Sequence, residues 1–207
     1  MDIFHDTEDR IRFIRTLRVY STERTIKIYH WVLMTNHFHL LVHFGNPREI
    51  SSIMAGMARS YVFYHHRKYN SAGHLFQGPF RAQPVEQDSY LLTCGRYIER
   101  NPVKAGICPK AEDFVYSSAR FYVQGKEDRV THENPLFKEM GANDAERHRT
   151  YRDFLRDENG EEESLFKNFS QPVGSASFHR RLVKERGIFQ PRKWRPGRGR
   201  GTLVVTD

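Results

Sequence analysis

The chain has 207 residues, of which 38% are hydrophobic and 28% are charged, a composition that fits one globular core with an appendage and excludes a large multidomain enzyme. Two cysteines exclude a disulfide framework or a four-cysteine zinc site, and no apolar run approaches the roughly 18 residues that span a bilayer, so we expect a cytoplasmic protein with no membrane partner. The formal net charge of +8 favours a polyanionic partner, nucleic acid first, because neutralised phosphates release counterions.

The first 70 residues predict two helices that flank a hairpin. A helix is expected over 6–22, which begins with an acidic first turn that complements the helix dipole. Residues 26–34 and 37–44 are rich in β-branched and aromatic side chains, and turn-forming residues separate them, so they predict two partly buried strands. A long amphipathic helix follows over 48–69.

The next segment predicts a loop, a short strand and a third helix. A glycine-containing loop covers 70–80, and 81–86 is expected to be a short strand. A helix capped by Asp88 or Ser89 then runs toward Asn101, where Pro102 is expected to stop or restart it.

Charge divides the chain into three predicted parts. Residues 1–125 form the expected domain, with 16 Lys and Arg against 11 Asp and Glu. Residues 126–177 carry 8 basic against 12 acidic side chains, have thin apolar periodicity and predict a weakly structured extension with one short helix at 144–156. Residues 178–207 carry 9 basic against 2 acidic side chains and predict a mostly irregular basic tail.

His37 and His39 are the first residues that could carry chemistry. Side chains two apart on a strand share a face, so two imidazoles would point the same way and form half of a divalent cation site. Such a pair also arises by chance. His43 does not extend the pair to an evenly spaced triplet, and we expect His43 to be a rim residue or a structural histidine.

Tyr97 and Asn101 are the second such pair, one helical turn apart, so the phenol and the carboxamide can face the same space. A phenol, whose pKa is ordinarily near ~10, is a weak nucleophile unless a cation neutralises the phosphate that it attacks. A surface tyrosine and an asparagine at a helix end are the plainer interpretation of this pair alone.

Four segments in order resemble a known family: IFHDTEDRIRF at 3–13, WVLMTNHFHLLV at 31–42, GHLFQGPF at 73–80 and RYIERNPVKAGI at 96–107. They are similar to the single-tyrosine HUH transposases, in their REP-associated (RAYT) branch. The similarity runs from about residue 3 to residue 122.

The resemblance implies an α+β, ferredoxin-like fold, an antiparallel sheet with helices on one face. It also implies a metal-dependent nuclease and strand transferase that acts on single-stranded DNA hairpins from palindromic or REP-type elements. His37, His39 and Asn101 would bind Mg²⁺ or Mn²⁺, and Tyr97 would form a 5′-phosphotyrosine link. Tyr90, two turns earlier, is the rival nucleophile, and we expect it to pack in the core.

Basic residues are the candidates for DNA contact, since such proteins bind through basic grooves and aromatic stacking. They are Arg59, Arg67, Lys68, Arg81, Arg192, Lys193 and Arg195. Each fits an ordinary solvated surface as well. The sequence leaves a homodimer open.

One departure from the family concerns the sheet. Relatives carry an extra strand before the segment that begins at Ile3, and we expect this first strand to be missing here. A misassigned start, a decayed element and a substitute segment from elsewhere in the chain are three alternatives that the sequence does not separate.

Two further functions compete with the transposase. An inactive or domesticated relative would bind hairpin DNA without strand transfer. A zinc hydrolase built on His37 and His39 is weaker, because no third His, Asp or Glu stands at ligand spacing.

Overall fold

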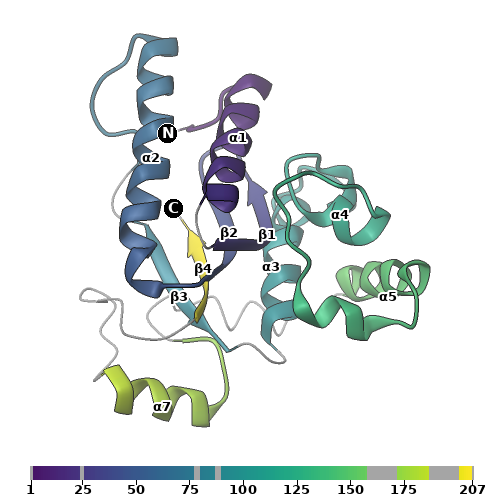
Figure 1. Cartoon of the computed structure of the whole chain (residues 1–207). Coiled ribbons are helices and arrows are strands. Elements are labelled where there is room, and N and C mark those ends of the chain that lie inside the picture. The colour runs from purple at the N-terminus through teal and green to yellow at the C-terminus, as the bar shows by residue number, and fades with distance from the viewer. Residues whose placement is uncertain are drawn as a thin grey trace.

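The computed structural model describes residues 2–23, 26–76, 80–86, 90–157, 172–186 and 201–206 (Figure 1). It is an α+β structure in which helices surround a small antiparallel sheet, as the sequence predicts. None of the helices in these ranges is both long and apolar enough to cross a membrane.

The N-terminal half follows the predicted order of elements. Helix α1 (Thr7–Glu23) begins with a reciprocal cap in which Asp6 Oδ1 accepts from the Asp9 amide at 2.9 Å and Asp9 Oδ2 accepts from the Asp6 amide at 3.4 Å. Strands β1 (Ile26–Leu33) and β2 (Phe38–Phe44) form the predicted hairpin.

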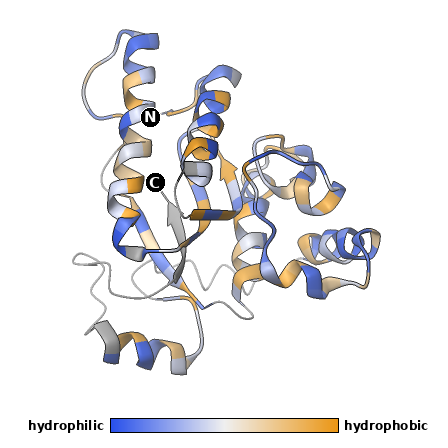
Figure 2. Ribbon diagram, viewed as in Figure 1, coloured by the Kyte–Doolittle hydropathy of each residue, from blue (hydrophilic) through white to orange (hydrophobic). Residues whose placement is uncertain are grey.

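Helix α2 follows the hairpin and confirms the predicted long helix. A 3₁₀ turn, η1 (Pro47–Glu49), leads into α2 (Ile50–Tyr69), which ends at Asn70 in the left-handed conformation, with φ of 46°. Figure 2 shows hydrophobic and hydrophilic residues alternating along α1, as expected of a helix that covers a core with one face.

Strand β3 (Arg81–Val85) and helix α3 (Tyr90–Lys104) also match the prediction, except at the end of the helix. Asp88 and Ser89, the expected caps, lie outside the described residues. The helix passes through Pro102 as one continuous element, so the expectation that it stops or restarts there is wrong.

The inner part of the sheet contains a strand that the sequence did not predict. Strand β4 (Gly201–Thr206) lies between β2 and β3 and is antiparallel to both, which gives the order β1-β2-β4-β3. His39 is opposite Thr206, and Arg81 is opposite the same residue from the other side. A C-terminal segment therefore supplies an inner strand, which is the third of the alternatives left open for the missing strand.

Helices cover both faces of the sheet, so the expectation of helices on one face needs correction. On one face, α1 and α2 pack on a first core that includes Phe38, Leu40 and Val42. On the other face, α3 packs on a second core that includes Leu41. The reason is that β2 is buried on both faces, and successive side chains of a strand point to opposite sides.

A β-bulge in β1 decides which way His30 faces. The pairing shifts between Ile28, which is opposite Val42, and His30, which is opposite Leu41, so Tyr29 is the extra residue. Directly opposed residues share a face, and Leu41 belongs to the second core. Without the bulge, His30 would point toward α1 and α2.

Residues 111–157 add a third core beside α3. The segment contains η2 (Ala111–Asp113), α4 (Ala119–Gln124), η3 (Pro135–Met140) and α5 (Asp144–Arg156), the last of which is the helix predicted at 144–156. Its buried residues are Ala111, Ala119, Tyr122, Val123, Phe137, Tyr151 and Leu155. The expected weak structure is therefore wrong for 126–157, while the division into three domains stays a prediction.

The basic tail is described in two pieces. Helix α7 (Ala176–Arg186) covers its beginning and β4 covers residues 201–206. Arg192, Lys193 and Arg195 lie outside the described residues.

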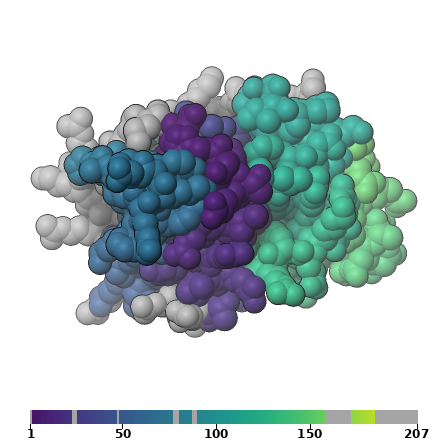
Figure 3. Space-filling model, turned by 90° about the horizontal axis from the view of Figure 1, so that it is seen from above, coloured from purple at the N-terminus to yellow at the C-terminus, as the bar shows by residue number. Residues whose placement is uncertain are grey.

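Seen from above, α1 lies between α2 and the part of the chain around residues 100–125, with α5 beyond it (Figure 3).

Candidate active site

Strand β2 and helix α3 bring the two predicted pairs of residues together. His39 lies on β2 opposite Val32 of the second core, so it faces α3, and His37 directly precedes the strand. The His37 and His39 rings are 4.9 Å apart between centroids, and the His39 and Tyr97 rings are 5.9 Å apart. The predicted site residues therefore meet on one face of the sheet.

His37 is half-buried and is oriented by its neighbour. Its Nδ1 lies 2.8 Å from Asn36 Oδ1, and since that oxygen only accepts, Nδ1 carries the proton. In this tautomer Nε2 has a free lone pair, which is what a metal ligand needs. Burial lowers the pKa of His37, which favours the same neutral form.

His39 is buried, with 6% of its surface exposed, and its Nδ1 is buried without a hydrogen-bond partner among the described residues. Burial and, after it, the nearby His37 lower the pKa of His39, and a hydrogen bond with Asn101 opposes them; the resulting pKa is about 3. The ring is therefore neutral at pH 7. An orphaned polar atom in a buried ring is costly and marks a place where a ligand would bind.

Asn101 explains why α3 continues through Pro102. A proline has no N–H to donate to the carbonyl of Ile98. The Asn101 side-chain nitrogen donates to the carbonyls of Tyr97, at 2.7 Å, and of Ile98, at 3.4 Å, and so replaces the lost bond. Because the Asn101 nitrogen is bonded to the helix backbone, the amide oxygen is the atom that is left to interact with His39.

Lys104 is a member of the site that the sequence reasoning missed. Its Nζ lies 5.1 Å from the centroid of the Tyr97 ring. The signal in the sequence is the spacing, since residues seven apart in a helix share a flank. A cation at this position supplies positive potential where a phosphate would approach the phenol.

The donor set fits a divalent cation. Among the residues that the structure describes, no three His, Cys, Asp or Glu side chains form a metal-binding group. The two imidazoles of His37 and His39 are nevertheless close together, Asn101 hydrogen-bonds His39, and the unpaired His39 nitrogen can accept a further partner.

Tyr90, the rival nucleophile, is the first residue of α3 and packs against the second core. His43 is only partly buried, and its ring lies 6.2 Å from that of Tyr29.

The predicted DNA-binding residues lie in different surroundings. Arg59 and Arg67 are exposed on α2, and Arg81 is exposed at the start of β3. These three side chains are accessible to a polyanion.

Lys68 instead holds α1 against α2. Its Nζ lies 2.7 Å from Asp6, 2.9 Å from Glu8 and 3.0 Å from Asp9. Burial raises the pKa of Asp9, but hydrogen bonds, first from Lys68 and then from Tyr69, outweigh it and lower the pKa to about 2. This cluster explains Lys68 as a structural residue.

Comparison with known proteins finds one related family. Residues 2–101, just under half of the chain, match the model of the family described as IS200-like transposases. No curated protein and no solved structure matches the chain. The family match ends at Asn101 and so contains the histidine pair and Tyr97. It supports the IS200-like transposase family for this region of the chain.

Proposed function

We propose that the chain is a metal-dependent endonuclease and strand transferase of single-stranded DNA, a transposase of the single-tyrosine HUH type. The observation that carries the proposal is the convergence of Tyr97 and Asn101 on one flank of α3 with the two histidines of β2. The REP-associated branch and hairpin substrates belong to the same proposal. The family match agrees with it at the level of a transposase.

Tyr97 is the proposed nucleophile. Its phenol oxygen bonds to the scissile phosphorus, the bond to the 3′ oxygen breaks, the phenol loses its proton and the 3′ oxygen gains one. The product is a 5′-phosphotyrosine and a free 3′-hydroxyl. A 3′-hydroxyl then attacks the phosphotyrosine and releases the phenol, so strand transfer needs no nucleotide cofactor because the link conserves the bond energy.

His37, His39 and the oxygen of Asn101 would hold Mg²⁺ or Mn²⁺. Such a cation, when bound, neutralises the scissile phosphate and stabilises the charge that develops on it. His37 and His39 contribute neutral rings in fixed orientations. Asn101 ties this set to the helix that carries Tyr97.

Exposed basic side chains would bind the DNA backbone. Arg59, Arg67 and Arg81 are the candidates among the described residues, and Arg192, Lys193 and Arg195 are further candidates from the sequence of the tail. Each phosphate contact that is removed should make the salt dependence of single-strand affinity shallower by about 0.7 in log–log slope. An unchanged slope after removal of 178–207 would show that the tail does not contact DNA.

The decisive experiment compares two tyrosines. The protein is incubated with a 3′-labelled single-stranded hairpin and Mn²⁺, and covalent adducts are separated on a denaturing gel. Tyr97→Phe should lose the adduct and keep DNA binding, since it removes only the nucleophilic atom. Tyr90→Phe is the matched control and should keep the adduct.

Two outcomes would redirect the proposal. An adduct that persists in Tyr97→Phe and vanishes in Tyr90→Phe would move the nucleophile to Tyr90. Hairpin binding without an adduct in the unmutated protein would favour the relative that binds DNA without strand transfer.

A further inference from the structure

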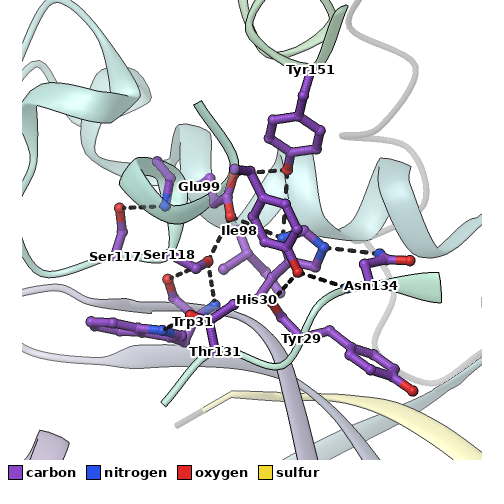
Figure 4. Close-up of polar contacts among 12 residues, drawn as sticks. Tyr29, His30, Trp31, Ile98, Glu99, Ser117, Ser118, Thr131, Asn134 and Tyr151 are labelled. Atoms are coloured by element: carbon purple, nitrogen blue, oxygen red, sulfur yellow. Dashed lines mark hydrogen bonds and ion pairs between the residues drawn. The ribbon is translucent and has the colours of Figure 1, made fainter. Parts of the chain in front are cut away.

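A buried hydrogen-bond network joins α3 to β1 beside the second core (Figure 4). Its centre is Glu99, whose side chain is fully buried and accepts three hydrogen bonds. The donors are Ser118 Oγ at 2.6 Å, Tyr151 Oη at 2.8 Å and His30 Nδ1 at 2.9 Å. Each of these donors is itself fully buried.

The orientation of His30 follows from its other neighbour. Asn134 Oδ1 accepts from the Leu136 amide at 3.1 Å, so the Asn134 amide nitrogen faces His30 Nε2, at 2.9 Å. Because that nitrogen only donates, Nε2 accepts and Nδ1 carries the proton that goes to Glu99. Both ring nitrogens of His30 therefore have hydrogen-bond partners, and the donor and acceptor of each bond at His30 are fixed.

The network ties α3 to four other segments. His30 comes from the bulged part of β1, Ser118 precedes α4, Asn134 caps η3 and Tyr151 comes from α5. Ser118 Oγ also accepts from the backbone amide of Trp31, at 2.9 Å. The third core, which the sequence did not predict, is thus connected to the helix that carries Tyr97.

Glu99 and Tyr97 lie on opposite flanks of α3. Two residues along a helix correspond to a rotation of about 200°, and Ile98 between them is fully buried in the second core. A rotation of α3 by about 15° would move an atom ~6 Å from its axis by about 1.5 Å, enough to misplace a nucleophile. Three hydrogen bonds at Glu99 resist that rotation.

Gly95 shows how closely α3 rests on His30. A Cβ atom at this position would lie 2.5 Å from His30 Cε1, inside the limit of atomic contact. A glycine therefore lets the helix approach the ring one turn before Glu99. Close contact and hydrogen bonding act on the same side of the helix.

We propose that Glu99 is a positioning residue for Tyr97. Held by His30, Ser118 and Tyr151, it fixes the rotation of α3 so that Tyr97 and Asn101 face the histidine pair. The inference rests on the proposed function, since it assigns the reason why that site is assembled. Glu99 would act through its bonds to His30, Ser118 and Tyr151 and not on the reacting atoms.

The test separates positioning from stability by a matched control. Glu99→Ala should lower the single-turnover rate of adduct formation at saturating hairpin by at least about tenfold, with hairpin affinity within about twofold. Glu99→Gln keeps the shape and an accepting oxygen, and should restore the rate to within about threefold. Tyr122→Phe is the control, because the Tyr122 hydroxyl is equally buried but bonds only backbone atoms of Tyr29, His132 and Asn134.

Equal rate losses in Tyr122→Phe and Glu99→Ala would overturn the inference, as would an unchanged rate in Glu99→Ala. Circular dichroism establishes that each variant is folded. If Glu99→Ala does not fold, Tyr151→Phe, which removes one of the three donors, should lower the rate about threefold, and an unchanged rate there has the same negative meaning.

A second measurement does not depend on activity. In ¹³C-tyrosine-labelled protein without DNA, the nuclear Overhauser contact between the Tyr97 and His39 rings should be present and should persist in Tyr122→Phe. It should be lost in Glu99→Ala, and its persistence there would refute the inference. No adduct in the unmutated protein would instead count against the proposed function, and this contact would still decide the role of Glu99.

Discussion

The two flanks of helix α3 hold buried histidines in opposite states. On one flank, His30 is fully buried and both of its ring nitrogens are hydrogen-bonded, to Glu99 and Asn134. On the other flank, His39 is also buried, but its Nδ1 has no hydrogen-bond partner among the described residues. Buried polar groups nearly always have hydrogen-bond partners. We therefore interpret His30 as a structural residue and His39 as part of a binding site.

The difference has an energetic consequence. Removing a member of a satisfied buried network leaves its partners without hydrogen bonds, which costs stability. Removing an unsatisfied group costs little stability and can relieve a desolvation penalty. Substitutions on the His30 flank should therefore reduce the free energy of unfolding and change the rate only through the position of Tyr97. Those on the His39 flank should reduce the rate of adduct formation directly.

The largest expected effect is on the His39 flank. His39→Ala should lower the rate of adduct formation by about a thousandfold or more, because it removes half of the paired imidazole site. Hairpin affinity should change little, since phosphate contacts elsewhere supply most of it. The measurement is adduct yield over time with Mg²⁺, alongside thermal unfolding of the metal-free protein, which should show no loss of stability. Undiminished cleavage in His39→Ala would remove this residue from the site.

The next largest effect is expected on the His30 flank of α3. Glu99→Ala should lower the free energy of unfolding by about 3 kcal/mol, because it leaves the buried donors of His30, Ser118 and Tyr151 unpaired. Urea denaturation measures it, and the midpoint should shift without a change in slope. A loss below about 1 kcal/mol would mean that the network is not more stabilising than an ordinary surface contact.

The pH dependence of stability sharpens the comparison. The pKa of His39 is about 3 in the folded protein and near 6.5 when unfolded, so acidification protonates the unfolded chain first. Stability that is present above pH 6.5 is therefore lost as the pH falls toward 3, by about 2 kcal/mol between pH 6.5 and 5. The glutamine of His39→Gln cannot titrate. Between pH 6.5 and 5, the free energy of unfolding of this variant should therefore fall by about 2 kcal/mol less than that of the unmutated protein, in denaturation curves measured without metal. Parallel curves for the two proteins would contradict the assignment of a neutral, buried His39.

The smallest effect comes from a matched pair of tyrosines. Tyr151→Phe removes a buried hydroxyl that donates to Glu99, and should lower the free energy of unfolding by about 1 to 2 kcal/mol. Tyr97→Phe, on the partly buried flank, should change it by less. The same denaturation experiment compares both, and a larger loss for Tyr97→Phe would reverse the roles assigned to the two flanks.

Much of the fold could be predicted from local sequence signals. Helices α1, α2 and α5 and the hairpin lie within one or two residues of their predicted bounds, because caps, turns and apolar periodicity are local properties. The predicted end of α3 was wrong. The Asn101 side chain donates the hydrogen bond that Pro102 cannot make, and this depends on one side-chain orientation.

The candidate site was predicted in the same way, residue by residue. His37 with His39 and Tyr97 with Asn101 are pairs whose members share a face by strand or helix spacing. That the two pairs meet is a tertiary fact, since β2 and α3 are separated by α2 and β3 in the chain. The DNA contact of Lys68 stays a prediction, and only the tertiary structure brings its side chain to Asp6 and Asp9.

The sequence by itself determined the α+β class, most helix and strand bounds and the pairs of residues that could do chemistry, because these depend on periodicity over a few residues. Only the tertiary structure decided which faces of the sheet are covered, that β4 lies between β2 and β3, and that the bulge at Tyr29 turns His30 toward Glu99. The physical reason is that burial and hydrogen-bond satisfaction depend on groups far apart in the chain. His30 and His39 both lie in the β-rich hairpin sequence, and only the partners brought to each by folding distinguish scaffold from site.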